Sequence, residues 1–165
     1  MKFIYKIILL AALFWVGSAS AQGVVVNSFQ SESYQKILTE YKNKPFMLVI
    51  WSVTCSACLS EMELIRKIQV QYSELNIVML SVDGPEYFDE MKQIIKQEQL
   101  QDLKQWGFAQ DNSPALRYTV DSRWYGELPR TYFFDAQHNK IGMSGVLSLE
   151  QYHQQIKLIQ PKIIM

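Results

Sequence analysis

Apolar residues along this chain form short runs that alternate with stretches of helical spacing. Two runs, at residues 45–51 and 76–82, are almost wholly apolar, which is typical of central strands buried on both faces of a sheet. A third run, 130–134, alternates and is aromatic, and together with 141–146 it predicts a hairpin around a turn at 135–140. Strands that alternate with helices before a closing hairpin indicate an α/β fold of three layers with a mixed sheet.

The segments between these strands carry apolar residues three or four positions apart, as one face of a helix does. The predicted faces comprise Tyr34, Ile37, Leu38 and Tyr41 in a first helix, Cys58, Met62, Ile65, Ile68, Tyr72 and Leu75 in a second, Phe88, Met91 and Ile95 in a third, and Tyr152, Ile156 and Ile159 in a last one. We expect Ser31 or Ser33 to cap the first helix and Ser148 to cap the last. A short strand is expected around Phe108, and a further helix is expected to open near Pro114.

The first residues have the character of a leader. Lys2 and Lys6 form a basic start, residues 7–16 are apolar, and Ala19 and Ala21 give the small-x-small pattern that signal peptidase cuts. The sequence therefore predicts a signal peptide over 1–21 and one domain over 22–165. An uncleaved membrane anchor is the alternative, although the apolar run is shorter than the about 20 residues that span a bilayer.

Charge excludes some functions. The chain has 16 basic and 16 acidic residues, and no run of Lys and Arg resembles a phosphate-binding stripe. We therefore expect no nucleic-acid partner. No Gly-rich phosphate loop is present in the sequence either.

Cys55 and Cys58 are the only cysteines, and they lie directly after the apolar run 45–51, where a helix is predicted to start. At a helix N-terminus, unpaired backbone N–H groups and the positive end of the helix dipole both favour a thiolate. Cysteines in Cys-x-x-Cys motifs have pKa values lowered from about 8.5 to roughly 3.5–7.5. We expect Cys55 to be the exposed attacking sulfur and Cys58, one turn further on, to be the resolving sulfur.

Other uses of this cysteine pair fit the sequence less well. Zinc would need two more ligands, and His138 and His153 lack the spacing of a zinc finger. Covalent haem would need a histidine where the chain has Leu59. A structural disulfide and the binding of copper(I) are the remaining alternatives, although so short a loop constrains the unfolded chain little. No metal or other cofactor is assigned to the site.

Taken with its surroundings, the cysteine motif resembles that of thioredoxin-fold proteins. Trp51 precedes the motif, and Glu61 follows it in the predicted helix. Downstream, Pro129 opens a strand within the segment 126–135. The likeness covers roughly residues 44–159 and is to the redoxin branch that includes exported TlpA-like and cytochrome-c-maturation thiol oxidoreductases. It implies a thioredoxin-like three-layer fold with an extra strand and helix inserted before Pro129.

The resemblance also implies roles for single residues. In that family the proline that matches Pro129 is cis and lies against the active-site disulfide; a proline there leaves the backbone of Leu128 free to pair with an extended substrate. The carboxylate that matches Glu61 tunes the thiols, and a partly buried Glu61 could accept the proton of Cys58 because desolvation raises its pKa. The alternatives are a proline that merely starts an edge strand and an ordinary solvated glutamate.

Some positions depart from the family pattern. Thioredoxins carry a buried Asp where this chain has Val49, and a Trp where it has Thr54, so general thioredoxin activity and its reduction potential do not carry over. We assign Leu128, Thr54 and Trp124 to substrate binding. Trp124 and Tyr125 lie where the substrate-facing loop of the family would fall and could form an apolar rim; packing in the core is the alternative.

The sequence thus predicts a periplasmic thiol–disulfide oxidoreductase. Its expected substrates are disulfide-containing envelope proteins, with an apocytochrome as one candidate, and its expected electron donor is a membrane thiol-electron transporter. One alternative is a disulfide donor or isomerase, since small local changes decide the direction of exchange. Another is a non-catalytic module that holds a protein partner or copper. A peroxidase of the same superfamily would want proline in place of Leu48.

Overall fold

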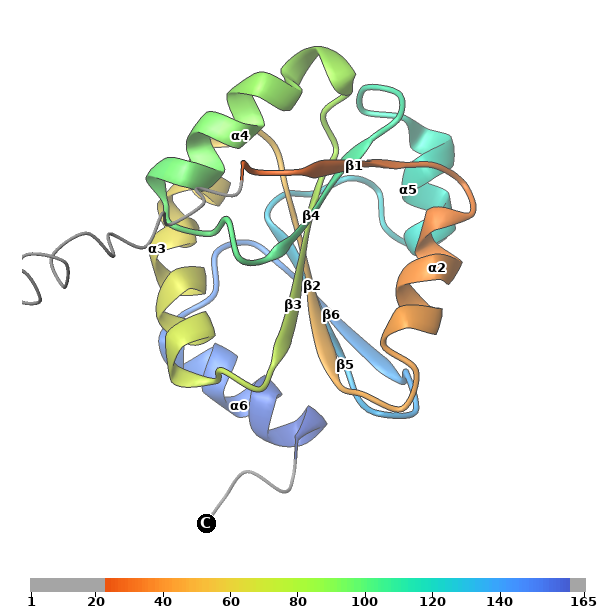
Figure 1. Cartoon of the computed structure of the whole chain (residues 1–165). Helices are drawn as coiled ribbons and strands as arrows, with labels where there is room; N and C mark the ends of the chain where they lie inside the picture. Colours follow the sequence, from red (N-terminus) through yellow and green to blue (C-terminus); the bar gives the residue numbers. More distant parts are fainter. Residues whose placement is uncertain (1–22, 161–165) are drawn as a thin grey trace, which may run out of the picture.

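The computed structural model describes residues 23–160 (Figure 1). The predicted signal peptide, residues 1–21, lies outside the described residues. The elements in chain order are β1 (Val26–Phe29), α2 (Ser33–Glu40), β2 (Phe46–Trp51), α3 (Ser56–Gln71), β3 (Asn76–Ser81), the 3₁₀ turn η1 (Pro85–Tyr87), α4 (Phe88–Gln97), β4 (Lys104–Phe108), α5 (Pro114–Val120), β5 (Arg130–Phe134), β6 (Lys140–Ser144) and α6 (Leu149–Ile159). No helix among the described residues is both long and apolar enough to cross a membrane.

The six strands form one mixed sheet in the order β1-β4-β3-β2-β5-β6. Strands β1, β4, β3 and β2 are parallel, whereas β5 pairs antiparallel with both β2 and β6. Strand β4, which follows helix α4, lies between β1 and β3. This is the inserted strand and helix that the resemblance implied, and the predicted α/β fold with a mixed sheet is confirmed.

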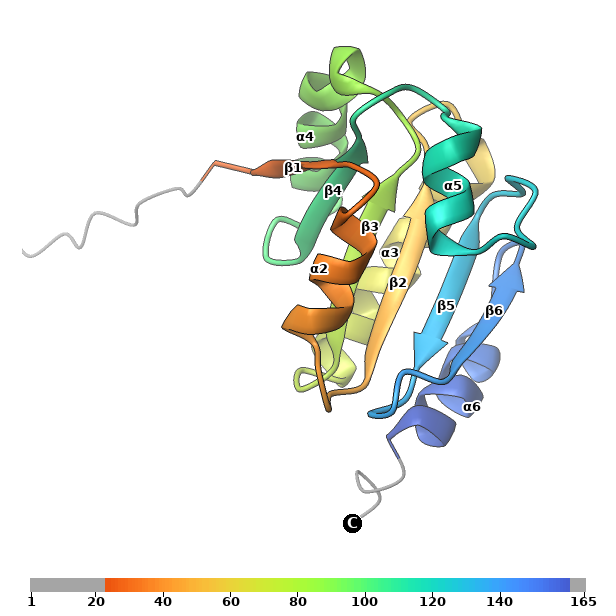
Figure 2. The ribbon, with the colours of Figure 1, turned by 90° about the vertical axis from the view of Figure 1, so that its right-hand side faces the viewer.

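Helices cover both faces of the sheet, α3, α4 and α6 one face and α2 and α5 the other (Figure 2). Strand β2 shows why both faces need a cover, because all six of its residues are buried. Met47, Val49 and Trp51 point into the core beneath α3, α4 and α6. Phe46 and the alternate residues after it point into the core beneath α2 and α5. Such two-sided burial explains the unbroken apolar run in the sequence.

The residues at the helix N-termini can be compared with the predicted caps. Ser148 caps α6 in a reciprocal capping box with Gln151, and Ser113 caps α5 with Pro114 in its first turn. The cap predicted for the first helix is wrong. Glu32 occupies the N-cap position without a side-chain hydrogen bond, and Ser33 is already helical. The Ser33 hydroxyl instead accepts the backbone N–H of Gln30 at 2.9 Å, which ties the helix start to the preceding turn.

Candidate functional site

Cys55 and Cys58 form a disulfide at the start of α3, with their Cα atoms 5.2 Å apart. Cys55 is the N-cap residue, and its Sγ accepts the backbone N–H of Cys58 at 3.1 Å. Cys55 is half-buried, whereas Cys58 is only 3% exposed. A thiolate on Cys55 would therefore keep a backbone donor and the positive helix end, while Cys58 can be reached mainly through its partner. This arrangement fits the predicted division into attacking and resolving sulfurs.

The loop before Cys55 is held by a buried carboxylate, Asp83, which sequence pattern alone did not identify as a site residue. Asp83 is 5% exposed and follows β3. Its Oδ1 accepts the Ser52 hydroxyl at 2.7 Å, and its Oδ2 accepts the backbone N–H of Val53 at 2.8 Å. The pairing of β2 with β3 is the feature from which this contact could have been predicted. Trp51 pairs with Ser81 in parallel strands, so continuing the register by two residues places Asp83 opposite Val53.

Pro129 lies at the same end of the sheet. Ile50 pairs with Arg130 across β2 and β5, so Pro129 stands beside Trp51, close to the cysteine loop. The Leu128–Pro129 peptide bond is cis. The Pro129 carbonyl accepts the backbone N–H of Gly145 at 2.8 Å, which joins the start of β5 to the segment after β6. The proline that the resemblance singled out therefore lies at the cysteine end of the sheet.

Leu128 contacts the apolar clusters on both faces of the sheet. Its half-buried side chain packs against the α3 side of the sheet, where Cys55 and Cys58 also lie, and against the opposite side. It thus lies at the cysteine end of the sheet, as the predicted substrate-binding role requires, while the role itself stays a prediction.

Glu61 is buried, with 2% of its surface exposed, and is not the solvated charge of the alternative interpretation. Its Oε1 accepts the backbone N–H of Leu147 at 2.7 Å and the Tyr152 hydroxyl at 3.1 Å. Burial raises the pKa of Glu61, and these two donors only partly oppose the shift. Cys58 and Glu61 lie three residues apart on one helix, and both belong to its buried face. A carboxyl group with a raised pKa beside a resolving thiol is suited to take up its proton.

The partners of Glu61 were not recognised as site residues in the sequence. Tyr152 was assigned only to the inner face of the last helix, where it is indeed fully buried. Its hydroxyl also lies 3.5 Å from that of Thr131 on β5. Burial next to Glu61 raises the pKa of Tyr152 well above its usual value, so it serves as a hydrogen-bond donor to the carboxylate.

The other proposed substrate-binding residues lie in different surroundings. Thr54 is exposed directly before Cys55 and lies at the site. Trp124 is 5% exposed in the core beneath α2 and α5, and its indole N–H donates to the Glu127 carbonyl at 3.0 Å. This placement favours the packing alternative for Trp124. Its neighbour Tyr125 is 87% exposed and is the aromatic side chain of this pair that a partner can reach.

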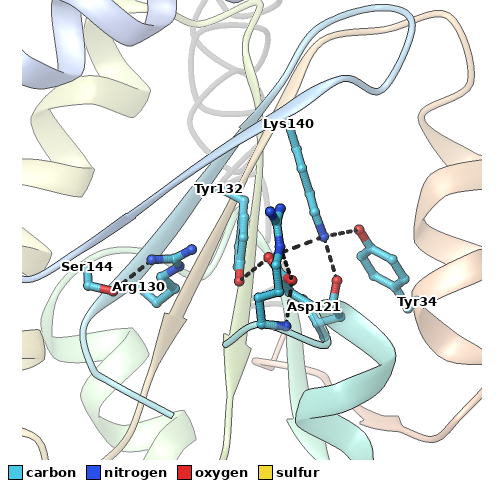
Figure 3. Close-up of polar contacts among 8 residues, drawn as sticks. Tyr34, Asp121, Arg130, Tyr132, Lys140 and Ser144 are labelled. Carbon is cyan, nitrogen blue, oxygen red and sulfur yellow. Dashed lines mark hydrogen bonds and ion pairs between the residues drawn. The ribbon is translucent and has the colours of Figure 1, made fainter. Parts of the chain in front are cut away.

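A second polar cluster occupies the face of the sheet covered by α2 and α5 (Figure 3). The Lys140 ammonium donates to the Val120 carbonyl at 2.6 Å and to the Tyr34 hydroxyl at 3.2 Å, and it lies 3.8 Å from Asp121. The Tyr132 hydroxyl donates to Asp121 at 3.2 Å. Burial lowers the pKa of Lys140, which the charge of Asp121 opposes. The cluster joins β6, β5, α2 and the end of α5 and contains no sulfur.

Metal ligands do not gather in the part of the chain that the structure describes. No group of three or more His, Cys, Asp or Glu side chains in residues 23–160 is arranged to hold an ion. The donors available at the site are the two sulfurs of Cys55 and Cys58, which are joined to each other.

The sheet order and the Cys-x-x-Cys pair at a helix start define a thioredoxin-like fold, and Pro129 lies at the same end of the sheet as this pair. No family model and no curated protein matches the sequence. Solved structures do match the fold. A secreted Mycobacterium tuberculosis disulfide oxidoreductase homologous to E. coli DsbE has a TM-score of 0.60 at 12% identity, covering 73% of this chain and 85% of its own.

Two further structures agree with this assignment. A thiol:disulfide interchange protein of the thioredoxin family from Chlorobium tepidum has a TM-score of 0.61 at 16% identity, over 74% of this chain and 83% of its own. A DsbF homologue from Corynebacterium diphtheriae has a TM-score of 0.58 at 17% identity, over 73% and 75%. The chain therefore has the thioredoxin-like fold that the resemblance implied.

Proposed function

We propose that this chain is a thiol–disulfide oxidoreductase that reduces disulfides in proteins of the cell envelope. The observation that carries the proposal is the pairing of a half-buried Cys55 sulfur at a helix N-terminus with a buried Cys58 one turn below it. The fold neighbours with a described activity are disulfide oxidoreductases and interchange proteins, which supports the same chemistry.

In the proposed reaction the reduced Cys55 thiolate attacks one sulfur of a substrate disulfide. A mixed disulfide forms, and the second substrate sulfur leaves as a thiolate that takes a proton from solvent. Cys58 then gives its proton to Glu61 and attacks the Cys55 sulfur. The first substrate sulfur departs, the substrate has gained two electrons, and the chain has lost two and holds the Cys55–Cys58 disulfide.

Export and partners belong to the same proposal. The leader-like composition of residues 1–21 supports export, and one of the fold neighbours is a secreted protein. An exported reductant needs a source of electrons, and we propose a membrane thiol-electron transporter that reduces the disulfide again. At the cysteine end of the sheet, the backbone of Leu128 and the exposed Thr54 would receive an extended segment of the substrate.

Trapping tests this function directly. In a Cys58→Ala variant the mixed disulfide on Cys55 cannot be resolved, so envelope proteins should accumulate as covalent adducts that a reductant releases. A Cys58→Ala variant that also carries Cys55→Ala is the matched control and should trap nothing. Equal yields from the two variants, or no adduct from either, would contradict the proposal.

The direction of electron flow is decided by the midpoint potential of the disulfide in glutathione or dithiothreitol buffers. A potential of about −270 mV or below supports the reductant, and one of about −120 mV supports the disulfide donor. Titration of the reduced protein with copper(I) tests the binding alternative, which predicts tight binding without turnover of a disulfide substrate.

A further inference from the structure

A buried carboxylate next to the cysteine loop has no cationic partner within residues 23–160. Asp83 belongs to none of the ion pairs formed among the described residues. Its contacts there are with donors, namely the Ser52 hydroxyl, the backbone N–H of Val53 and the Ser81 hydroxyl. An ionised carboxylate only accepts hydrogen bonds, and three converging donors suit that form. The donors around Asp83 are thus arranged for a negatively charged carboxylate, with which no cation of the described segment forms an ion pair.

The same contacts connect Asp83 to the attacking cysteine. The Ser52 hydroxyl donates to Asp83, so the hydroxyl of Thr54, 3.0 Å from Ser52 Oγ, is the donor in that second contact. The backbone N–H of Thr54 also donates to Ser52 Oγ at 3.2 Å, and that of Cys55 donates to the Ser52 carbonyl at 3.1 Å. Each residue between the carboxylate and the sulfur is thus held in place by a hydrogen bond.

Chain geometry limits how far the charge can be from Cys55. Val53, which Asp83 contacts at 2.8 Å, precedes Cys55 by two residues, and two residues span at most about 7 Å. The carboxylate therefore lies within about 10 Å of the Cys55 backbone, which is comparable to the Debye length in physiological salt. Because Ser52, Val53 and Asp83 are all buried, solvent screens the interaction only partly.

We propose that Asp83 is a positioning residue that fixes the loop before Cys55 and whose charge favours the disulfide over the dithiol, so that the protein donates electrons. This inference rests on the proposed thiol–disulfide exchange and assigns its direction. The disulfide is neutral, whereas the reduced pair carries a thiolate on Cys55. A fixed negative charge nearby repels that thiolate, so the reduced state gives up its electrons more readily. The positive end of α3 acts in the opposite direction, and Asp83 offsets part of its effect.

The test is the equilibrium of the purified full chain with dithiothreitol buffers at pH 8, with free thiols counted by alkylation and mass spectrometry. Asp83→Asn removes the charge at nearly constant size. We expect the equilibrium constant to shift about tenfold toward the dithiol, the size expected for unit charges about 10 Å apart. That corresponds to a potential about 30 mV less negative. The rate of Cys55 alkylation should also reach half its maximum at a lower pH than in the unchanged protein.

Two variants serve as controls. Asp111 lies on the neighbouring loop, is exposed, and accepts the backbone N–H of Gly84, the residue after Asp83. Asp111→Asn makes the same chemical change without touching the cysteine loop and should shift the equilibrium less than twofold. Ser52→Ala removes the hydrogen bond to Asp83 and the two that the Ser52 hydroxyl accepts from Thr54, but it leaves the charge of Asp83. It should also stay within twofold.

The outcomes separate this inference from the function on which it rests. If the unchanged protein has no reversible midpoint, the proposed function fails. If the unchanged protein has a reversible midpoint potential, and Asp83→Asn leaves that potential unchanged or makes it more negative, only the inference about Asp83 is overturned. Should Asp83→Asn not fold, Asp83→Ser repeats the test with a small hydroxyl that can still accept from Val53. Failure of both variants to fold assigns Asp83 a purely structural role and likewise overturns the inference.

Discussion

Glu61 and Asp121 are carboxylates at opposite faces of the same sheet, and their pKa values move in opposite directions. Burial raises the pKa of Glu61 despite its two hydrogen bonds. Asp121 is also partly buried, which acts to raise its pKa, but the backbone N–H of Arg123 and the Lys140 ammonium outweigh this and hold its pKa below the usual range. Glu61 is buried more deeply than Asp121, and Asp121 also has backbone N–H and Lys140 contacts that favour its ionised form. Burial and the nearby cation therefore both separate the two pKa values.

This contrast separates structural from chemical use of a buried charge. On the α2 and α5 side, Lys140 and Asp121 partly neutralise each other and join four elements of the fold (Figure 3). On the α3 side, Glu61 lies close to the sulfurs along the chain without an ion-pair partner among the described residues. A carboxylate without a cation takes up a proton more easily, and functional sites are where such perturbed groups cluster.

The largest effect should come from a change on the cysteine side. Cys55→Ser should eliminate reduction of a disulfide substrate such as insulin, because the attacking sulfur is lost. Lys140→Met, on the opposite side, should keep the rate within about twofold of the unchanged protein in the same assay while lowering thermal stability. A comparable loss of turnover in both variants would show that turnover depends on both faces of the sheet.

Glu61→Gln should slow turnover at neutral pH by about a hundredfold, the lower end of the range for a lost proton acceptor. Glu63→Gln is the matched control, since Glu63 lies two residues further on the same helix, exposed and paired with Lys67. It should leave the rate unchanged. Equal rates for the two variants would remove Glu61 from the mechanism.

The pH dependence of the free energy of unfolding provides a second test of the raised pKa of Glu61. A carboxyl group with a raised pKa binds more protons in the folded than in the unfolded protein, so its contribution to stability falls as pH rises through the interval above 4.5. Urea unfolding between pH 4 and 7 should show this decline in the unchanged protein. Glu61→Gln should flatten it, because the amide does not titrate.

Asp121→Asn should lower the free energy of unfolding at pH 7 by about 1–3 kcal/mol, because the Tyr132 hydroxyl and the Lys140 ammonium lose an ionised partner. The lowered pKa of Asp121 means that its contribution is present above about pH 4 and is lost as pH falls through its folded-state value. The variant and the unchanged protein should therefore converge in acid. Asp89→Asn, at an exposed ion pair with Lys92, should leave stability nearly unchanged, because solvent screens that pair.

Much of this architecture could be predicted from local pattern. The unbroken apolar run of β2 marks a central strand because both of its faces are covered, and the spacing of Met62, Ile65 and Ile68 marks the buried side of α3. The start of the first helix could not be placed as well. Two serines were available, and the turn at Gln30 uses Ser33 for its own hydrogen bond. Competition between a turn and a cap depends on tertiary position.

The site was predictable where the chemistry is local. Cys55 and Cys58 are neighbours in sequence, and one helix start places them. Asp83 and Tyr152 reach the site from separate elements, through the pairing of β2 with β3 and the docking of α6 on the sheet. Contacts between distant segments leave no periodic pattern in the chain. No pattern therefore marked Asp83 as a site residue, and Tyr152 looked like one more core residue.

The smallest expected effect is that of Tyr125, in the segment before Pro129. Tyr125→Ala should change the free energy of unfolding by less than about 0.5 kcal/mol, because its side chain is 87% exposed. Trp124→Ala should cost about 3–5 kcal/mol, since the indole is buried. Chemical denaturation of the two variants checks both values.

If a partner contacts this surface, Tyr125→Ala should raise KM for a protein substrate a few-fold and leave KM for a small disulfide unchanged, because the small molecule does not extend so far. An unchanged KM for both substrates would restrict substrate recognition to the loop of Thr54 and the backbone of Leu128, and a stability loss above about 1 kcal/mol would show that Tyr125 packs on the domain like its neighbour.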